Sequence, residues 1–104
     1  MKDVVLDGKR MTSAEEAHRY LAGALDFPPY YGGNLDALAD CLSELGEGVS
    51  VELKNAGAMR AQLGGYAESL LRVFEDVSGN PGAFRFRVRG RRKAPPADGG
   101  QGAK

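Results

Sequence analysis

Two segments of the chain alternate strictly between apolar and polar residues. Val49 to Leu53 reads VSVEL, and Ala83 to Arg89 reads AFRFRVR. A period of two is typical of a β-strand with one buried face and one face in water. A strand covered on both faces would instead read as a continuous apolar run. We therefore expect both segments to lie in a sheet that packs on the rest of the protein through one face only.

Helical patterns precede and separate these strands. A first strand, Lys2 to Asp7, leads to Ser13 and Glu16, whose spacing predicts a capping box at the start of a helix that runs to about Leu25. Asn34 is placed to cap a second helix. The pattern up to the second strand is therefore strand, helix, helix.

The same pattern repeats after the second strand. Asn55 to Ser78 is helical in pattern, and Gly64-Gly65 predicts a break between two helices. Helical connections between strands imply parallel pairing with right-handed crossovers. With the strands in the order 1-2-3, both crossovers place their helices on the same face. The predicted fold class is α/β, a two-layer structure with a three-stranded parallel sheet and helices packed on one face.

The open face of this sheet is predicted to be charged. Glu52 and Lys54 would face water beside the row Arg85, Arg87 and Arg89, and could pair with it across the strands. The simpler interpretation of this row is the solvent face of an edge strand, protected by its charge from aggregation. The alternative is a nucleic-acid-binding surface that extends from Arg85 to Lys93.

Length and composition predict one domain in a reducing compartment. The 104 residues suffice for one domain, which we place at residues 1–89. Residues 90–104 are basic and rich in Gly and Pro, so we expect a disordered tail. No apolar run is long enough to cross a bilayer, no signal peptide is recognisable, and the single Cys41 cannot form an internal disulfide. We expect a cytoplasmic protein without a membrane partner.

The net charge of zero conceals two halves of opposite sign. Residues 1–84 contain 7 basic and 13 acidic side chains, whereas residues 85–104 contain 7 basic and 1 acidic side chain. An acidic body repels phosphate, so nucleic acid is the less favoured partner.

The segment Pro28 to Leu42, PPYYGGNLDALADCL, has a composition that no folding requirement explains. On a helical wheel, one side carries the leucines at 35, 38, 42 and 45, and the other carries Asp36, Asp40 and Glu44. Carboxylates one turn apart repel by roughly 0.2–0.5 kcal/mol, and no basic residue is spaced to pair with Asp40. This face is therefore either merely solvated or built for a positively charged partner. A pair of catalytic carboxylates is a third alternative.

Three further side chains of this segment and the histidine before it have features that predict their environment. Of the adjacent Tyr30 and Tyr31, we expect one to pack on the core and the other to be exposed at an interface. The only histidine, His18, is expected to be solvated or at the edge of the core, and Cys41 to be a small buried hydrophobic residue. A lone histidine without a cysteine pair predicts no metal site, and no cofactor is expected.

The run YYGGNLDALADCL resembles the signature of the barstar family of intracellular ribonuclease inhibitors. AESLLRVFED resembles the last helix of that family, and VSVEL and FRFRV fit its second and third strands. The resemblance covers nearly all of residues 2–89. It implies the fold described above and a protein that is not an enzyme but plugs the active site of a small guanyl-specific microbial ribonuclease in a 1:1 complex.

The resemblance also implies which residues bind the ribonuclease. Asp40 would be the central anchor in the phosphate-binding site of the enzyme, and Asp36 would support it. The other implied contact residues are Tyr30, Gly32, Asn34, Leu35, Ser43, Glu44 and Asp76. The family prototype has a tryptophan where this chain has Ala39 and a second one near Leu45, so Ala39 is expected to affect which enzyme is recognised.

Overall fold

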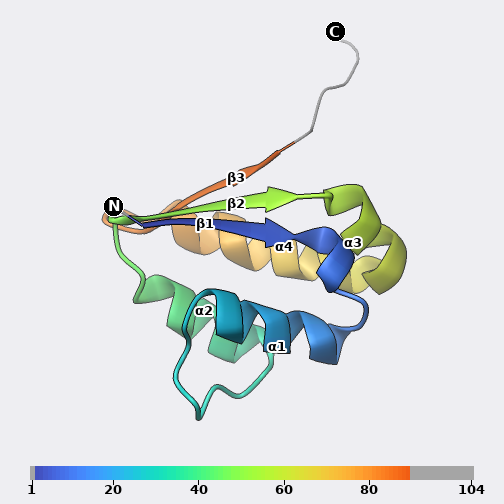
Figure 1. Ribbon diagram of the computed structural model, residues 1–104. Coiled ribbons are helices and arrows are strands. Elements are labelled where there is room, and N and C mark those ends of the chain that lie inside the picture. The colour runs from blue at the N-terminus through green and yellow to red at the C-terminus, as the bar shows by residue number, and fades with distance from the viewer. Residues whose placement is uncertain (1, 90–104) are drawn as a thin grey trace, which may run out of the picture.

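The computed structural model describes residues 2–89, and its centre is a three-stranded parallel sheet (Figure 1). The strands lie in the order β1-β2-β3, with the bounds β1 Lys2–Asp7, β2 Val49–Lys54 and β3 Arg85–Val88. The fold class predicted from the alternating strands is therefore confirmed. The predicted tail, residues 90–104, lies outside the described residues.

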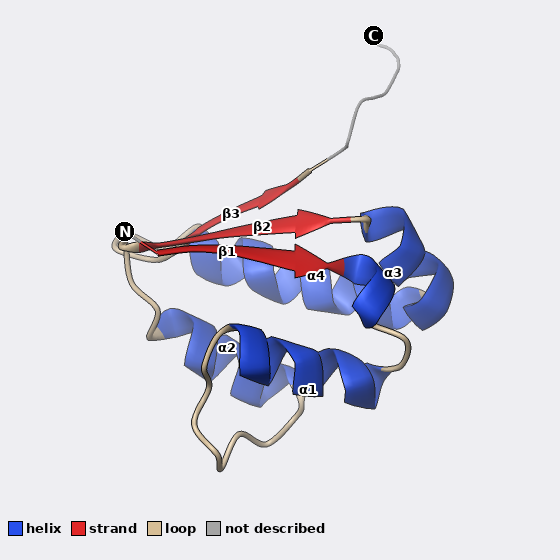
Figure 2. Cartoon of the chain, viewed as in Figure 1, coloured by secondary structure: helices blue, strands red, loops and turns tan. Residues whose placement is uncertain are grey.

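All the helices lie on one side of the sheet or at its edge (Figure 2). A short 3-10 turn follows β1, and four α-helices follow in the predicted pairs: η1 Gly8–Arg10, α1 Ala14–Ala24, α2 Leu35–Ser43, α3 Ala56–Leu63 and α4 Gly65–Ser78. The break between α3 and α4 falls at Gly64, whose φ of 60° is in the region that favours glycine. No helix of residues 2–89 lies on the other face of the sheet.

The strand register separates the two faces of the sheet. Val51 lies between Val4 and Phe86 on the face toward the helices. The next position along brings Glu52 of β2 beside Arg87 on the open face. Glu52 accepts hydrogen bonds from Arg89 Nε at 2.7 Å and from Arg87 Nη2 at 3.4 Å, which confirms the predicted pairing for Glu52.

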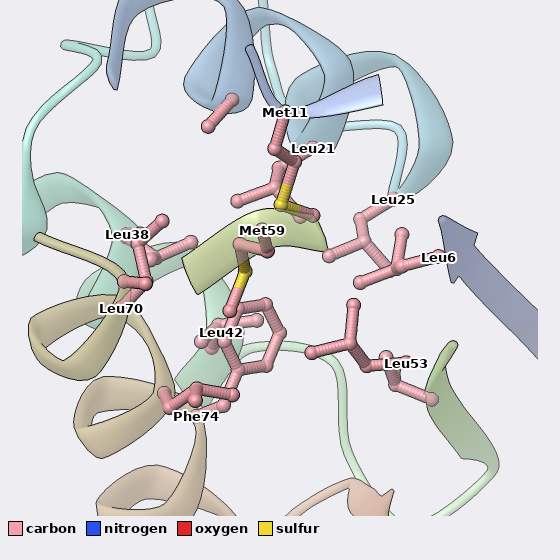
Figure 3. Packing of buried hydrophobic residues seen from close by; sticks show 14 of the residues in the cluster. Leu6, Met11, Leu21, Leu25, Leu38, Leu42, Leu53, Met59, Leu70 and Phe74 are labelled. Atoms are coloured by element: carbon pink, nitrogen blue, oxygen red, sulfur yellow. The ribbon is translucent and has the colours of Figure 1, made fainter. Parts of the chain in front are cut away.

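One apolar cluster fills the space between the sheet and the helices (Figure 3). It takes side chains from every layer, and the residues labelled in the figure are Leu6, Met11, Leu21, Leu25, Leu38, Leu42, Leu53, Met59, Leu70 and Phe74. Burying a leucine or phenylalanine side chain stabilises a protein by about 1.5–3 kcal/mol. This cluster therefore holds each helix at a fixed rotation against the sheet.

Side-chain oxygens cap the first two α-helices as the sequence predicts. Ser13 Oγ accepts a hydrogen bond from the Glu16 amide at 3.1 Å, and Asn34 Oδ1 accepts one from the Ala37 amide at 2.8 Å. The capping box before α1 is only half formed, because the Glu16 carboxylate binds Arg19 Nη1 at 2.7 Å. An i, i+3 ion pair on the helix surface takes the place of the second capping bond.

The turn η1, which follows β1, lies in close contact with the start of α3, which follows β2. Gly8 is buried against the backbone of Asn55, and a Cβ atom at Gly8 would overlap the Asn55 carbonyl oxygen. Gln62 Nε2 donates to the carbonyls of Gly8 at 3.1 Å and Met11 at 2.9 Å. No side chain other than hydrogen fits at Gly8 without movement of the backbone.

We predict that Gly8→Ala lowers the free energy of unfolding by about 1–3 kcal/mol, the usual cost of overpacking. Chemical denaturation measures this change. Gly57→Ala is the matched control, because Gly57 lies in α3 with open space around its Cα. Alanine at that helical site should stabilise by about 0.5–1 kcal/mol. If Gly8→Ala and Gly57→Ala changed the free energy of unfolding equally, the contact of Gly8 with the Asn55 backbone would not restrict the side chain at position 8.

Candidate partner-binding site

The orientation of α2 follows from two leucines. Leu38 and Leu42 are both 0% exposed, and α2 packs mainly on α4. They belong to the same buried cluster as Leu70 and Phe74 of α4 (Figure 3). Because an α-helix turns about 100° per residue, burial of this side directs the opposite side of α2 to the solvent.

That opposite side carries the acidic row Asp36, Asp40 and Glu44, and all three residues are exposed. The ion pairs within the described residues involve α1, α3, α4 and the sheet, and none involves this row. The leucine and carboxylate faces predicted for this segment are thus observed. Their charges remain available to a partner.

The edges of the leucine face are less buried than its centre. Leu35 and Leu45 are half-buried, and so is Cys41, which we had expected to be buried. That expectation was wrong, because Cys41 lies at the margin of the leucine face and not at its buried centre. Partial burial raises the pKa of the Cys41 thiol, and the charges of Glu44 and Asp40 raise it further.

The loop between α1 and α2 divides its two tyrosines as predicted. Tyr30 is 86% exposed, whereas Tyr31 is half-buried with its ring centroid 4.9 Å from that of Phe27. The loop projects from the helical layer on the side away from the sheet (Figure 1). Just before α2 it passes through Gly33, with a φ of 70°. Tyr30 is therefore an aromatic ring free to meet a partner.

His18 connects this loop to two helices. Its Nδ1 lies 2.6 Å from the Tyr31 hydroxyl and its Nε2 lies 2.7 Å from the Tyr66 hydroxyl, so α1, the loop and α4 meet at one ring. In the neutral imidazole one nitrogen donates and the other accepts, and a tyrosine hydroxyl can serve either. Both ring nitrogens are thus satisfied away from water.

The solvated position expected as one alternative for His18 was therefore wrong, and the alternative at the edge of the core is confirmed, since its partners Tyr31 and Tyr66 are only half-buried. His18 is 4% exposed, and burial holds its pKa below the usual value. Burial disfavours the charged form of the tyrosines as well, and it therefore raises the pKa of the Tyr31 and Tyr66 hydroxyls. We call His18, Tyr31 and Tyr66 the His18 cluster. The two tyrosines lie 13 and 48 residues from His18 along the chain, so no local sequence pattern predicts the cluster.

The remaining predicted contact residues lie around the acidic row. Ala39 is half-buried on α2, between Asp36 and Asp40, and Ser43 Oγ donates to the Asp40 carbonyl at 2.7 Å. The exposed residues that complete the surface are Gly32 and Asn34 before α2, Glu44 at its C-terminal end and Asp76 on α4.

The tertiary structure joins one distant residue to this surface. Leu35 of α2 and Asp76 of α4 line the same groove, whose volume is about 400 Å³. Asp76 is therefore part of a surface continuous with α2. Tyr30 and Glu44 lie at the two ends of that surface, ahead of α2 and at its C-terminal cap.

The arginine row of the nucleic-acid alternative lies on the other layer. Arg87 and Arg89 are both hydrogen-bonded to Glu52, and the bond from Arg89 is the main reason that the pKa of Glu52 is lowered. The basic residues at 91–93 lie outside the described residues. Of the row that the structure describes, only Arg85 has no carboxylate bonded to it.

Residues 2–89 contain neither a metal-binding cluster nor a membrane-spanning helix. No three or more His, Cys, Asp or Glu side chains in this part of the chain come together as a metal ion would require. Over the same residues, no helix combines the length and apolar character needed to span a membrane.

Comparison with known proteins relates the whole described chain to one family. Residues 1–90 match the family model described as Barstar (barnase inhibitor). A protein of Bacillus subtilis strain 168, named "Putative ribonuclease inhibitor YrdF", is 39% identical over 78 residues, which cover 74% of this chain and 86% of that protein.

The His18 cluster predicts a pH dependence of stability. The folded-state pKa of His18 is lowered, so the imidazole of the unfolded chain is protonated first as the pH falls, at about pH 6.5. Stability should therefore be complete above this pH and be lost as the pH falls from there toward the folded-state pKa. One proton gives a slope of at most about 1.4 kcal/mol per pH unit.

Urea denaturation between about pH 8 and pH 5 measures this slope, and His18→Gln should flatten it. The chain has a single histidine, so no second imidazole titrates in this window. The lowered pKa values of Asp7 and Glu52 act only at more acid pH. An unchanged slope in His18→Gln would assign the effect to another group.

Proposed function

The chain belongs to the barstar family, and from this membership we propose that it is a ribonuclease inhibitor. We further propose that its target is a small guanyl-specific microbial ribonuclease of the barnase type, bound in a 1:1 complex. The inhibitor would act as a binding protein rather than as an enzyme. The proposed contact surface consists of α2, the loop before it and the exposed end of α4.

The observation that carries this proposal is the unpaired acidic row on α2. Asp36 and Asp40 are held on a helix whose opposite face is buried, so their positions are fixed before any partner arrives. A ribonuclease binds the phosphate of RNA with cationic side chains in a concave site. A carboxylate on a rigid helix can occupy that site, and the enzyme has no bond there to hydrolyse.

Asp40 is the proposed anchor, because it lies at the middle of the row with Asp36 and Glu44 one turn away on either side. Prior ordering of α2 and of the loop reduces the entropy that binding must overcome. The His18 cluster contributes to this ordering, since it fixes Tyr31 next to the exposed Tyr30.

Electrostatic attraction should set the rate of association. The acidic body of residues 1–84 and the unpaired row on α2 would attract a cationic enzyme from a distance. Salt screens such charges over about 8–10 Å at ordinary ionic strength. The association rate should therefore fall as salt is added.

Ala39 is proposed to affect which ribonuclease is bound. It lies between the two aspartates and is small and half-buried, so the centre of the surface is flatter than a tryptophan would make it. Aromatic side chains at such central positions often supply a large share of the binding energy. A target with a bulkier rim around its phosphate site would fit this shape.

The compartment belongs to the same proposal. A cytoplasmic inhibitor would protect the RNA of the cell from its own ribonuclease, and the single cysteine is compatible with a reducing compartment.

We predict that Asp40→Ala lowers the affinity for the target by about 2–5 kcal/mol or more, because the cations of the enzyme site are left buried and unpaired. Titration of a guanyl-specific ribonuclease such as barnase with the protein, followed by an RNA cleavage assay, measures this loss. Asp3→Ala is the matched control, since it removes the same charge from the exposed edge of the sheet. Inhibition by Asp40→Ala at the level of this control would rule out Asp40 as the anchor.

A further inference from the structure

The loop of residues 26–33, which precedes α2, is a stiff segment that turns sharply at both ends. Asp26 and Gly33 have φ values of 59° and 70°, in the left-handed region that few residues other than glycine adopt. Between them, the rings of Pro28 and Pro29 fix two further backbone angles. The loop should therefore move as a unit, with most of the change in backbone angles at its two ends.

The loop is attached to the helical layer through a small number of contacts. A pocket of about 750 Å³ is lined by residues of α1 and of the loop together, so the two do not pack closely along their whole length. Phe27 and Tyr31 contact the edge of the apolar cluster. Within residues 2–89, the hydrogen bond that connects a loop side chain to a helix joins the Tyr31 hydroxyl to Nδ1 of His18. The His18 ring is therefore the main polar restraint on the position of the loop.

Tyr66 holds this ring from the side of α4. Its hydroxyl lies 2.7 Å from His18 Nε2, and the two rings meet edge-on with their centroids 5.9 Å apart. Tyr66 is half-buried and lies in the first turn of α4. The hydrogen bond at one nitrogen of an imidazole determines the tautomer and the orientation that the other nitrogen presents. A change at the Tyr66 hydroxyl should therefore affect Tyr31 on the opposite side of the ring.

We infer that Tyr66 is a positioning residue of the inhibitor, whose hydroxyl acts through His18 and Tyr31 to hold the loop in the conformation that the ribonuclease binds. The inference rests on the proposed function and concerns how its contact surface is positioned. Helix α4 then supports that surface at two places, because Tyr66 at its start fixes the loop and Asp76 near its end belongs to the proposed contact residues.

The expected effect follows from the population of the bound conformation. A partner that binds one conformation of the loop loses apparent affinity in proportion to the fraction of molecules that adopt it. Loss of one hydrogen bond corresponds to a change of about 2- to 10-fold in such an equilibrium. Removal of the Tyr66 hydroxyl should therefore weaken binding by this factor, although the hydroxyl acts inside the inhibitor.

The test compares the full-length protein with its Tyr66→Phe variant, which keeps the ring and loses only the hydroxyl. The probe is the most strongly inhibited member of a panel of purified guanyl-specific microbial ribonucleases, barnase among them. The dissociation constant of Tyr66→Phe for this enzyme should be about 2- to 10-fold higher than that of the wild type.

Tyr20→Phe is the matched control. The Tyr20 hydroxyl on α1 accepts a hydrogen bond from the Asp7 amide at 2.9 Å, at the end of β1 and not at the loop. Each of the two variants loses one hydroxyl that is bonded within the fold, so urea denaturation should show similar losses of stability. Only Tyr66→Phe should bind the ribonuclease more weakly than the wild type.

Amide hydrogen exchange gives a second readout that a general loss of stability would not produce. The Phe27 amide donates to the Ala22 carbonyl at 2.9 Å, and the Tyr31 amide donates to the Pro28 carbonyl at 3.0 Å. Both amides should exchange faster in Tyr66→Phe and at the wild-type rate relative to the core in Tyr20→Phe. In a His18→Gln background, Tyr66→Phe should cause no further loss of affinity, because the connection to Tyr31 is already broken.

The outcomes separate this inference from the proposed function. If Asp40→Ala abolishes inhibition but Tyr66→Phe binds as tightly as Tyr20→Phe, the inference on Tyr66 is wrong and the function stands. A further loss of affinity from Tyr66→Phe in the His18→Gln background would also overturn it, because Tyr66 would then act on the enzyme directly. If Asp40→Ala inhibits as well as the wild type, the proposed function fails and the positioning role of Tyr66 falls with it.

Discussion

The packing of α2 on α4 is the constraint on which the rest of this surface depends. Leu38 and Leu42 are completely buried, and they fix both the position of α2 and its rotation about its own axis. A rotation by half a turn would expose two leucines and bury two aspartates, and burial of unpaired carboxylates is far more costly than their exposure. The direction of the acidic row is thus a consequence of the core. The groove that Leu35 and Asp76 line has the same origin, since it forms where the first residue of α2 meets α4.

The loop before α2 is held by a different kind of interaction. Apart from the aromatic contact of Phe27 with Tyr31, its main anchor is the pair of hydrogen bonds between His18, Tyr31 and Tyr66. These bonds are neutral, and their cost of desolvation is offset because every polar atom of the ring has a partner. The leucines of α2 are insensitive to pH, whereas this cluster is not. The position of the loop should therefore depend on pH, whereas the position of α2 should not.

Local patterns were sufficient to predict the order of the elements but not the contacts that join them. Alternation in β2 and β3 predicted a sheet open on one face, and Asn34 predicted the start of α2, because each signal is contained within a few residues. The two faces of α2 were readable for the same reason. The partners of His18 and the close approach of Gly8 to Asn55 were not, since they join residues 13 to 48 positions apart. The groove that Leu35 and Asp76 line likewise exists only once α2 lies against α4.

The distribution of ion pairs distinguishes the two charged faces of the molecule. On the open face of the sheet, Glu52 binds both Arg87 and Arg89, so much of the positive charge there is neutralised within the fold. On the helical side, the acidic row has no such partners among residues 2–89. Charges that a fold leaves unpaired on a rigid surface cost little in water and retain their full interaction for a partner. This contrast favours the acidic row of α2 over the arginine row as the binding surface, and it favours a cationic partner.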